Sequence, residues 1–262
     1  MAEISRSSFE SAYQKGLMGV ACRLAGSGRR IEIAANGRQA VDYTRCGYLG
    51  LDSHPAVLQA AKASLDEIPS IHFSVARTRL TAEPLAYLEE RLAQLFGVHR
   101  VVVFPTVAAA NMGCLPLLAA GLFTGGRKPL IVVDRYAHVT LQYHIPVLRE
   151  DTEVVVIGHN DLDQLESYCR AGGPVAYIGD GAYSMGGAAP VRELRQLQDR
   201  YDLFLYLDDA HGISVAGRRG AGFVRSRLDT LGERTIIAAS LGKGYGASGG
   251  LVMLGTAEQE AS

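Results

Sequence analysis

The stretch PVAYIGDGAYSMGGAAPVRELRQLQDRYDLFLYLD, residues 174–208, places an amphipathic segment between two apolar runs. The runs PVAYIG and LFLYLD are rich in Val, Ile and Leu without clean polar alternation, as expected of strands that are buried on both faces. The apolar residues of Pro190–Tyr201 recur at helical spacing, and Pro190 stands where a first-turn proline belongs. The stretch therefore predicts two strands of a parallel sheet with a helix between them.

The same alternation continues on both sides of this stretch. Five further runs predict buried strands: VVVF from Val101, PLIVVD from Pro129, TEVVVIG from Thr152, TIIAAS from Thr235 and GLVML from Gly250. Three further segments have helical spacing: Pro84–Phe96, Ala108–Leu122 and Asp161–Arg170, the last with Asp161 as a helix N-cap. We therefore expect an α/β fold, with a mostly parallel seven-stranded sheet that carries helices on both faces.

Residues 1–50 have a different pattern from the rest of the chain. A polar lead is followed by RIEIAANGRQAVDY, in which Asn36-Gly37 predicts a type I′ hairpin turn. We expect an N-terminal arm over residues 1–50 that packs on a main domain over residues 51–262. In an open parallel sheet the ligand site lies beyond the carboxyl ends of the strands, so polar residues at those ends are the candidates for function.

Composition excludes several classes of protein. The 262 residues include 26 Lys and Arg against 27 Asp and Glu, a balance that argues against a broad nucleic-acid surface. We interpret the one dense basic patch as a solvated loop face: Arg218, Arg219, Arg225 and Arg227. Four cysteines lie far apart without a CxxC pair, which predicts neither a metal site nor a disulfide framework and fits a reducing cytoplasm.

A membrane span or a secretory leader is not expected. The first sixteen residues are polar and carry acids, so they lack the apolar core of a signal peptide. The uncharged stretch Val101–Phe123 is long enough to span a bilayer, but Pro105 and Pro116 interrupt it and it begins with a β-branched run. A buried strand followed by a buried helix explains this stretch better than a membrane span.

One lysine has an unusual context. Lys243, within SLGKGYGASGG, is the only charged residue between Thr235 and Ala257. Because it follows a strand, among glycines and with apolar chain on both sides, we expect its amine to be partly desolvated. Desolvation lowers the pKa of an amine and frees its lone pair for Schiff-base chemistry. The alternative is a lysine that simply reaches solvent from a loop.

Two further strand ends carry polar residues. LFLYLDDAHG ends a strand with adjacent carboxylates that point to opposite faces, so only one of them can enter a given pocket. Asp208 and His211 could face one site, where a buried carboxylate beside an imidazole suits a cofactor whose ring nitrogen must stay protonated. His138 follows PLIVVD and is placed to lie flat over a planar ligand. Alternatively, the carboxylates cap the next turn and the histidines are structural.

The glycines of Gly244–Gly249 match GxGxxG and offer a rival interpretation. A dinucleotide site needs a following helix and an acidic residue about 20 positions further on. Here the next segment is strand-like and the chain reaches Ser262 soon afterwards. A phosphate-binding P-loop is also disfavoured, because Lys243 is followed by Gly and Ile237 stands where the first glycine belongs. Nucleotide binding is therefore the least supported alternative.

The ordered set of motifs resembles a known family. The segments GYLGLDSHP, AHVT, HND, GAYSMGGAAP, DDAHG and SLGKGYGASGG follow one another between Tyr43 and Gly255. In this order they resemble the α-oxoamine synthases, such as 8-amino-7-oxononanoate synthase, 2-amino-3-ketobutyrate CoA ligase and serine palmitoyltransferase. These enzymes use pyridoxal 5'-phosphate (PLP) and have the aspartate aminotransferase fold. The resemblance implies that the predicted sheet is the large, PLP-binding domain of that fold.

The resemblance also implies roles for single residues. Lys243 matches the lysine that forms a Schiff base with PLP, and Asp208 matches the aspartate that pairs with the pyridine nitrogen. His138 matches the histidine stacked on the ring, and these three are the candidate catalytic residues. His211 matches a histidine near the phenolic oxygen of the cofactor, and Ser184 a serine at its edge. The other cofactor-binding candidates match residues in or beside the phosphate site: Thr106, Val107, Ala108, Asn111 and Ser240.

The chain departs from the family pattern at several positions. SIHFSVARTRLTAEPL replaces a glycine-rich segment, Cys46 replaces an asparagine, Asp180 a glutamate and Val107 a phosphate-loop glycine. Family members also run further, and the part that we expect to be missing resembles their small C-terminal domain, whose arginine grips the substrate carboxylate. Arg23 is only a loose candidate for a substrate contact.

The function implied by the resemblance is a PLP-dependent acyltransferase. It would condense an amino acid with an acyl-CoA through the Lys243 Schiff base, as a cytoplasmic homodimer. An aminotransferase, aldolase or lyase of the same fold would use the same cofactor residues, and the altered segment 70–84 keeps this alternative open. A truncated homologue that binds PLP or a partner without turnover is a third interpretation.

Overall fold

The computed structural model describes residues 2–26, 28–68, 70 and 75–262. All seven predicted strands form, and they join one sheet in the order β4-β10-β9-β8-β7-β5-β6. The strands are β4 (Arg100–Phe104), β5 (Leu130–Asp134), β6 (Val154–Ile157), β7 (Val175–Asp180), β8 (Leu203–Asp208), β9 (Thr235–Ser240) and β10 (Gly250–Leu254). Neighbouring strands are parallel except that β10 pairs antiparallel with both β4 and β9. The prediction of a mostly parallel seven-stranded sheet is confirmed.

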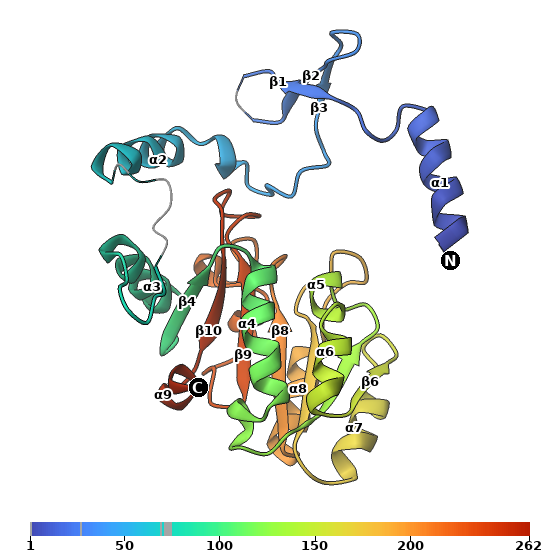
Figure 1. Cartoon of the computed structure of the whole chain (residues 1–262), viewed down its shortest axis with the longest axis vertical. Coiled ribbons are helices and arrows are strands. Elements are labelled where there is room, and N and C mark those ends of the chain that lie inside the picture. Colours follow the sequence, from blue (N-terminus) through green and yellow to red (C-terminus); the bar gives the residue numbers. More distant parts are fainter. Residues whose placement is uncertain (1, 27, 69, 71–74) are drawn as a thin grey trace.

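Helices cover both faces of this sheet, as predicted (Figure 1). One face carries α4 (Val107–Ala119), α5 (Val139–Gln142) and α6 (Ile145–Asp151), and the other carries α3 (Glu83–Phe96), α7 (Leu162–Arg170) and α8 (Val191–Arg200). Strand β8 serves both cores, because successive side chains of a strand point to opposite faces. Leu203, Leu205 and Leu207 pack toward α8, whereas Phe204 and Tyr206 pack toward α4. These two cores fix the sheet rigidly.

Several predicted boundaries are corrected by the structure. The helix predicted over Ala108–Leu122 ends as α4 at Ala119, and a short 3₁₀ helix follows at Leu122–Thr124. Between them Gly121 has a φ of +87°, which departs from helical geometry and ends α4. A Cβ there would lie 2.8 Å from the Arg127 carbonyl carbon, so this position requires glycine. Pro190 is the N-cap residue of α8 rather than a residue of its first turn.

The N-terminal residues lie to one side of the seven-stranded sheet (Figure 1). They form α1 (Ala2–Gln14), a three-stranded antiparallel sheet of β1 (Cys22–Leu24), β2 (Arg30–Ile33) and β3 (Gln39–Val41), and then α2 (Pro55–Glu67) after a 3₁₀ turn at Leu51–Ser53. Neither α1 nor α2 was predicted. None of the residues of α2 is buried, so this helix lacks the apolar face that sequence patterns reveal.

The predicted hairpin forms between β2 and β3, but the predicted turn is wrong. Glu32 lies opposite Gln39 in the ladder, so residues 34–37 form a longer connection than a two-residue turn. Only Gly37 in this connection has a positive φ, of 68°. A type I′ turn needs positive φ at both of its central residues, and Asn36 does not have it.

Three other sequence interpretations can be compared with the structure. Val101–Phe123 contains β4 and α4, and among the described residues no helix is long and apolar enough to cross a membrane. All four cysteines are free thiols. The basic patch is only partly a solvated face, because Arg225 donates hydrogen bonds to the carbonyls of Phe96, Gly97 and Leu228 and so joins the end of α3 to the 225–228 turn.

Candidate active site

The polar residues that end four strands meet at one edge of the sheet. Asp134, Asp180, Asp208 and Ser240 are the last residues of β5, β7, β8 and β9. Asp180 lies directly beside Asp208 in the parallel ladder. The start of α4 lies at the same edge, since Phe104 of β4 faces Gly250 of β10, which in turn faces Ser240. We name this set of strand ends and the loops that follow them the strand-end edge.

Lys243 lies in the loop that joins β9 to β10 at the strand-end edge. Its Nζ is 2.7 Å from Nε2 of His211, and Nδ1 of the same ring is 2.5 Å from the hydroxyl of Tyr48. The structure therefore joins three residues that are far apart in the sequence into one hydrogen-bonded chain. The lysine does not simply extend into solvent, which was the alternative interpretation of its context.

Burial shifts the pKa values of Lys243 and His211 in this hydrogen-bonded chain. Burial lowers the pKa of Lys243, although the carboxylates of Asp208 and Asp180 act in the opposite direction. Burial, with the charges of Lys243 and His138, lowers the pKa of His211 to about 4. His211 is thus neutral near pH 7 and carries one proton that can sit on either ring nitrogen. It can accept a proton on the side of Lys243 while it releases one toward Tyr48.

Asp208 is fully buried under the same edge. Its two oxygens accept hydrogen bonds from the Ala210 N–H at 3.0 Å and from Nδ2 of Asn111 at 3.3 Å. The hydroxyl of Tyr206 donates to Oδ1 of Asn111 and so fixes the orientation of that amide. Burial raises the pKa of Asp208, because these neutral donors offset only part of the cost of burying its charge.

The neighbouring Asp209 faces away from Asp208, as the alternation of side chains predicts. Its Oδ2 accepts a hydrogen bond from the Val224 N–H at 3.0 Å, and its buried Oδ1 has no hydrogen-bond partner among the described residues. Burial raises the pKa of Asp209 to about 7. This carboxyl group contacts the 212–224 loop instead of the residues around Lys243.

His138 lies where β5 leads into α5. Its backbone N–H donates to Oδ1 of Asp180 at 2.9 Å, and its Nδ1 is 2.8 Å from the hydroxyl of Thr140. Burial and the nearby Asp208 carboxylate raise the pKa of Asp180 to about 7. Through the hydrogen bond from the His138 N–H, Asp180 at the end of the neighbouring strand β7 fixes the position of the His138 backbone.

The start of α4 presents free hydrogen-bond donors at the strand-end edge. Thr106 is the N-cap, and its hydroxyl accepts from the Ala109 N–H at 3.0 Å. The first backbone bond of the helix runs from the Ala110 N–H to the Thr106 carbonyl, so the N–H groups of Val107 and Ala108 have no partner within the helix. A Cβ at Gly250 would lie 2.2 Å from the Val107 nitrogen, so glycine is required for this close approach.

The remaining candidates are placed around this edge. Ser240 is buried, and its hydroxyl accepts from the Gly242 N–H at 3.1 Å. Ser184 is exposed at the tip of the loop that follows β7. Arg23 is different, because its guanidinium pairs with Glu32 within the N-terminal sheet. Cys46 is exposed, and residues 71–74 of the altered segment lie outside the described residues.

Sequence reasoning did not single out three residues that belong to this edge. Tyr48 contacts His211 from the part of the chain that runs from α1 to α2, which we name the N-terminal segment. Asp134 forms an ion pair with His159. The signals were present in the sequence, since Tyr48 is in GYLGLDSHP, Asp134 ends a strand and His159 begins HND. Which of these side chains meet depends on the strand order, and no local pattern contains that order.

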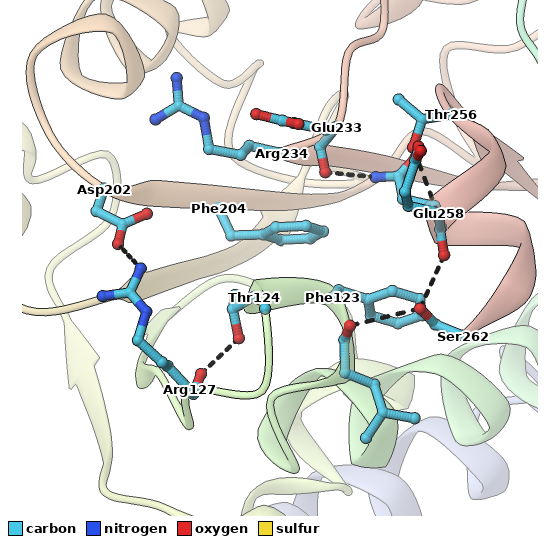
Figure 2. Close-up of a pocket in the computed structure, with 13 residues that line it drawn as sticks. Phe123, Thr124, Arg127, Asp202, Phe204, Glu233, Arg234, Thr256, Glu258 and Ser262 are labelled. Atoms are coloured by element: carbon cyan, nitrogen blue, oxygen red, sulfur yellow. Dashed lines mark hydrogen bonds and ion pairs between the residues drawn. The ribbon is translucent and has the colours of Figure 1, made fainter.

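A cavity lies at the opposite edge of the sheet (Figure 2). It has a volume of about 380 Å³ and is bounded by residues that precede β8 and β9, by Phe204 of β8, by the 122–127 turn and by α9 (Ala257–Ala261). Arg127 and Asp202 form an ion pair across part of it. Its lining contains no lysine, histidine or cysteine, so it lacks a candidate nucleophile or general base of those types.

Comparison with known proteins agrees with the motifs. The relatives include 8-amino-7-oxononanoate synthases from Geobacter sulfurreducens, 32% identical over 224 residues, and Chromobacterium violaceum, 33% identical over 227 residues. The matches cover 84% of this chain but only 55% and 56% of the relatives, so the chain spans just over half their length. These relatives confirm the resemblance to the α-oxoamine synthases.

Solved structures show the same fold. Serine palmitoyltransferase from S. paucimobilis with a bound PLP–myriocin aldimine superposes with a TM-score of 0.82 at 20% identity, over 97% of this chain and 65% of that one. Serine palmitoyltransferase from Sphingomonas wittichii gives a TM-score of 0.80 at 24% identity, over 98% and 65%. The family model described as aminotransferase class I and II matches residues 46–259. The chain belongs to the aminotransferase class I and II family.

Proposed function

We propose that the strand-end edge holds PLP and that the protein condenses an amino acid with an acyl-CoA. One observation carries this proposal: a half-buried lysine amine, a fully buried aspartate and the free N–H groups of a helix N-terminus converge at one edge. The relatives named 8-amino-7-oxononanoate synthase support the acyl-transfer half of the proposal. The PLP adduct in the serine palmitoyltransferase structure supports the cofactor half.

The residues at this edge fit PLP. Asp208 is buried and accepts hydrogen bonds only from neutral groups among the described residues, so a protonated ring nitrogen would supply the missing cation. The N–H groups of Val107 and Ala108, with the hydroxyls of Thr106 and Ser240, suit the phosphate group. Asn111 fixes Asp208, His138 would cover the ring, and Ser184 and His211 would lie at its edge. When bound, PLP supplies an electron-accepting ring that stabilises a carbanion at the substrate α-carbon.

Lys243 would hold the cofactor through Nζ and, as a free amine, would act as the base that takes the substrate α-proton. Burial lowers the pKa of Lys243 and so favours the neutral amine that both roles require. Nε2 of His211 can then take a proton from Lys243, while Nδ1 passes one to the hydroxyl oxygen of Tyr48, which in turn gives its own proton to solvent. Tyr48 is 40% exposed, so this chain of groups connects Lys243 with solvent.

We further infer that residues 51–262 are the PLP-binding large domain and residues 1–50 an N-terminal arm. All the site candidates from the motifs lie in the first of these ranges. We also infer a homodimer, since apolar side chains on α2, α3 and α4 are left exposed: Leu58, Leu65, Tyr87 and Met112. Light scattering after size exclusion tests the dimer, and a monomer at micromolar concentration would contradict it.

Turnover tests the reaction type. The protein is mixed with PLP, glycine, alanine or serine, and acyl-CoA substrates of several chain lengths, and released CoA thiol and the ketone product are measured. We expect CoA release that needs both the amino acid and PLP and that is lost in Lys243→Ala. Formation of a keto acid without CoA release would identify an aminotransferase instead. Bound PLP without any turnover would identify a non-catalytic homologue.

A further inference from the structure

The loop that carries Ser184 has few contacts of its own. It leaves β7 and turns back before α8, with an isolated bridge between Ala182 and Ala188. Within it the Tyr183 N–H donates to the Gly187 carbonyl, and the Ala189 N–H donates to the Gly181 carbonyl. Residues 184–187 are exposed, so other contacts must fix the tip of the loop.

His159 supplies the main contact to this tip. Its Nε2 lies 2.8 Å from the Gly186 carbonyl, and its Nδ1 lies 3.0 Å from Oδ1 of Asp134. The ring stacks on Tyr136 and meets the edge of Tyr183, with ring centroids 4.6 Å apart in both cases. The imidazole therefore forms a bridge from the end of β5 to the loop after β7.

Asp134 is the fixed end of this bridge. It is fully buried and also accepts hydrogen bonds from the N–H groups of Tyr136 at 2.7 Å and Asn160 at 2.8 Å, and from the hydroxyl of Tyr177 at 3.3 Å. A carboxylate with this many donors holds a defined position. The side-chain amide of Asn160 donates to the Ala188 carbonyl and adds a second tie to the loop.

The two nearest partners of the His159 ring nitrogens are oxygens that can only accept. Both hydrogen bonds can form together only when both nitrogens carry a proton, that is, in the imidazolium form. The amide of Asn160 is also 3.2 Å from Nε2, but the Gly186 carbonyl is closer. Burial lowers the pKa of His159, but the bonds to Asp134 and Gly186 and the charges of Asp134 and Asp180 outweigh it, so the pKa is raised.

We propose that the His159 imidazolium is a positioning group that fixes the 183–188 loop, and with it Ser184, at the edge of the cofactor site. The Ser184 part of this inference rests on the proposed function, whereas the link between His159 and the loop does not. The titratable groups that face the ring are Asp134, Asp180, Tyr136 and Tyr183, with Tyr177 behind Asp134. The pKa of Asp180 is raised to about 7, so this carboxyl group also titrates between pH 6 and pH 9, and the protonation of the imidazole must be read from the ring itself.

The first test uses the wild-type protein without PLP. The ¹⁵N chemical shifts of the His159 ring report whether both nitrogens are protonated at pH 6. Exchange of the Tyr183 and Ala189 amides is followed from pH 6 to pH 9 and corrected for the intrinsic rate. Because the pKa is raised, the bridge is complete at low pH and is lost as pH rises through that pKa. We expect protection of both amides to fall by about tenfold across this step.

The second test compares two histidine variants. His159→Asn can bond to Asp134 or to Gly186 but not to both, so we expect about tenfold faster exchange of the two amides at pH 6 and no pH step. His99→Asn is the matched control, because His99 also pairs with a carboxylate, Glu260 at 2.9 Å, and lies away from the loop. His99→Asn should leave both amides at wild-type rates.

The outcomes separate this inference from the proposed function. A neutral His159 ring at pH 6, or unchanged loop exchange in His159→Asn together with no pH step in the wild type, overturns the inference. If His159→Asn does not fold, the wild-type titration alone decides. Loss of PLP attachment at Lys243 in the wild type would overturn the proposed function and leave the amide exchange results unaffected.

Discussion

The strand-end edge and the N-terminal segment both place residues near Lys243, but the first region is deeply buried and the second is largely exposed. The edge is built on β5, β7, β8 and β9, whose residues are almost all buried between two helical layers. In the N-terminal segment, by contrast, α2 has no buried residue and the three strands β1–β3 are exposed or half-buried. Tyr48 of this segment is nevertheless within 2.5 Å of His211.

This difference in burial indicates which region determines the stability of the protein and which contributes mainly to the proton chain. Burial on both faces fixes the backbone of the edge, so Asp208 and Ser240 are positioned by the fold itself. Polar contacts such as those of Arg45 with Asp42 and Asp52 hold the N-terminal segment together internally. The bond of Tyr48 to His211 and the close approach of Gly246 to Leu51 and Asp52 join the segment to the strand-end edge. We therefore expect substitutions at the edge to affect stability and cofactor binding, and substitutions in the segment to affect mainly the proton chain.

The largest contrast is expected for apolar truncation. Leu205 is fully buried in β8, whereas Leu24 in β1 is 69% exposed. Leu205→Ala should lower the free energy of unfolding by about 2–5 kcal/mol, because it removes buried contacts and leaves a cavity. Leu24→Ala should change it by about 0.5 kcal/mol or less. Urea unfolding followed by circular dichroism measures both, and equal losses would break the contrast.

The next contrast concerns cofactor affinity. Asp208→Asn removes the buried charge that we assign to the ring nitrogen, and we expect PLP to bind about tenfold to hundredfold more weakly. Asp52→Asn is the control from the N-terminal segment, where Asp52 accepts a bond from Arg45. It should bind PLP as the wild type does. Titration of the visible absorption band measures both affinities, and an unchanged affinity in Asp208→Asn would remove Asp208 from the site.

A smaller effect is expected where the two regions touch. Tyr48→Phe removes one hydrogen bond to His211, and we expect PLP to attach to Lys243 about threefold to tenfold more slowly. Tyr43→Phe is the matched control, since Tyr43 lies in the same segment and is 84% exposed. Stopped-flow absorbance measures the rates. Equal rates in the two variants would mean that Tyr48 plays no part in proton transfer to Lys243.

The smallest effect is expected in the pH dependence of stability. Here one carboxyl group from each region is compared, Asp209 near the strand-end edge and Asp42 in the N-terminal segment. Burial raises the pKa of Asp209 to about 7. The free-energy penalty that this carboxyl group imposes on the folded state therefore grows from about pH 4 to about pH 7 and is constant above pH 7. Asp209→Asn should therefore gain stability relative to the wild type as pH rises over that range.

Asp42 has the opposite shift. Hydrogen bonds from Thr44 and Arg45 lower the pKa of Asp42 to about 2, so its contribution is present above pH 4 and is lost as pH falls toward 2. Asp42→Asn should lose local structure near pH 7 and differ little from the wild type near pH 2. Thermal unfolding of Asp209→Asn and amide exchange in residues 42–45 of Asp42→Asn measure the two trends. Parallel pH trends in the two variants would contradict the account.

The sheet was predictable because each of its strands is buried on both faces and so forms an unbroken apolar run. The helices α5 and α6 were not, since 4 and 7 residues are too few to display a helical period. The hairpin turn was wrong because Asn-Gly also occurs in longer connections, where only the glycine needs a positive φ.

The site residues that directly follow strands were predictable from the sequence, and the contacts between distant segments were not. Asp208, Ser240 and Lys243 follow strands whose carboxyl ends meet at one edge. Tyr48 was missed because it reaches His211 across 163 positions from a segment without buried strands. The bridge from Asp134 through His159 to Gly186 was missed because it depends on three neighbouring strands, β5, β6 and β7, whose order is not local information.

Attachment of PLP to Lys243 tests the central claim most directly. The chain has four lysines, and the other three are Lys15, Lys62 and Lys128. The protein is incubated with PLP, its visible spectrum is recorded, and borohydride reduction is followed by peptide mass mapping. We predict a visible band that reduction removes and one phosphopyridoxyl group per chain, on Lys243. A label spread over the exposed lysines, or no label on Lys243, would contradict a cofactor site at the strand-end edge.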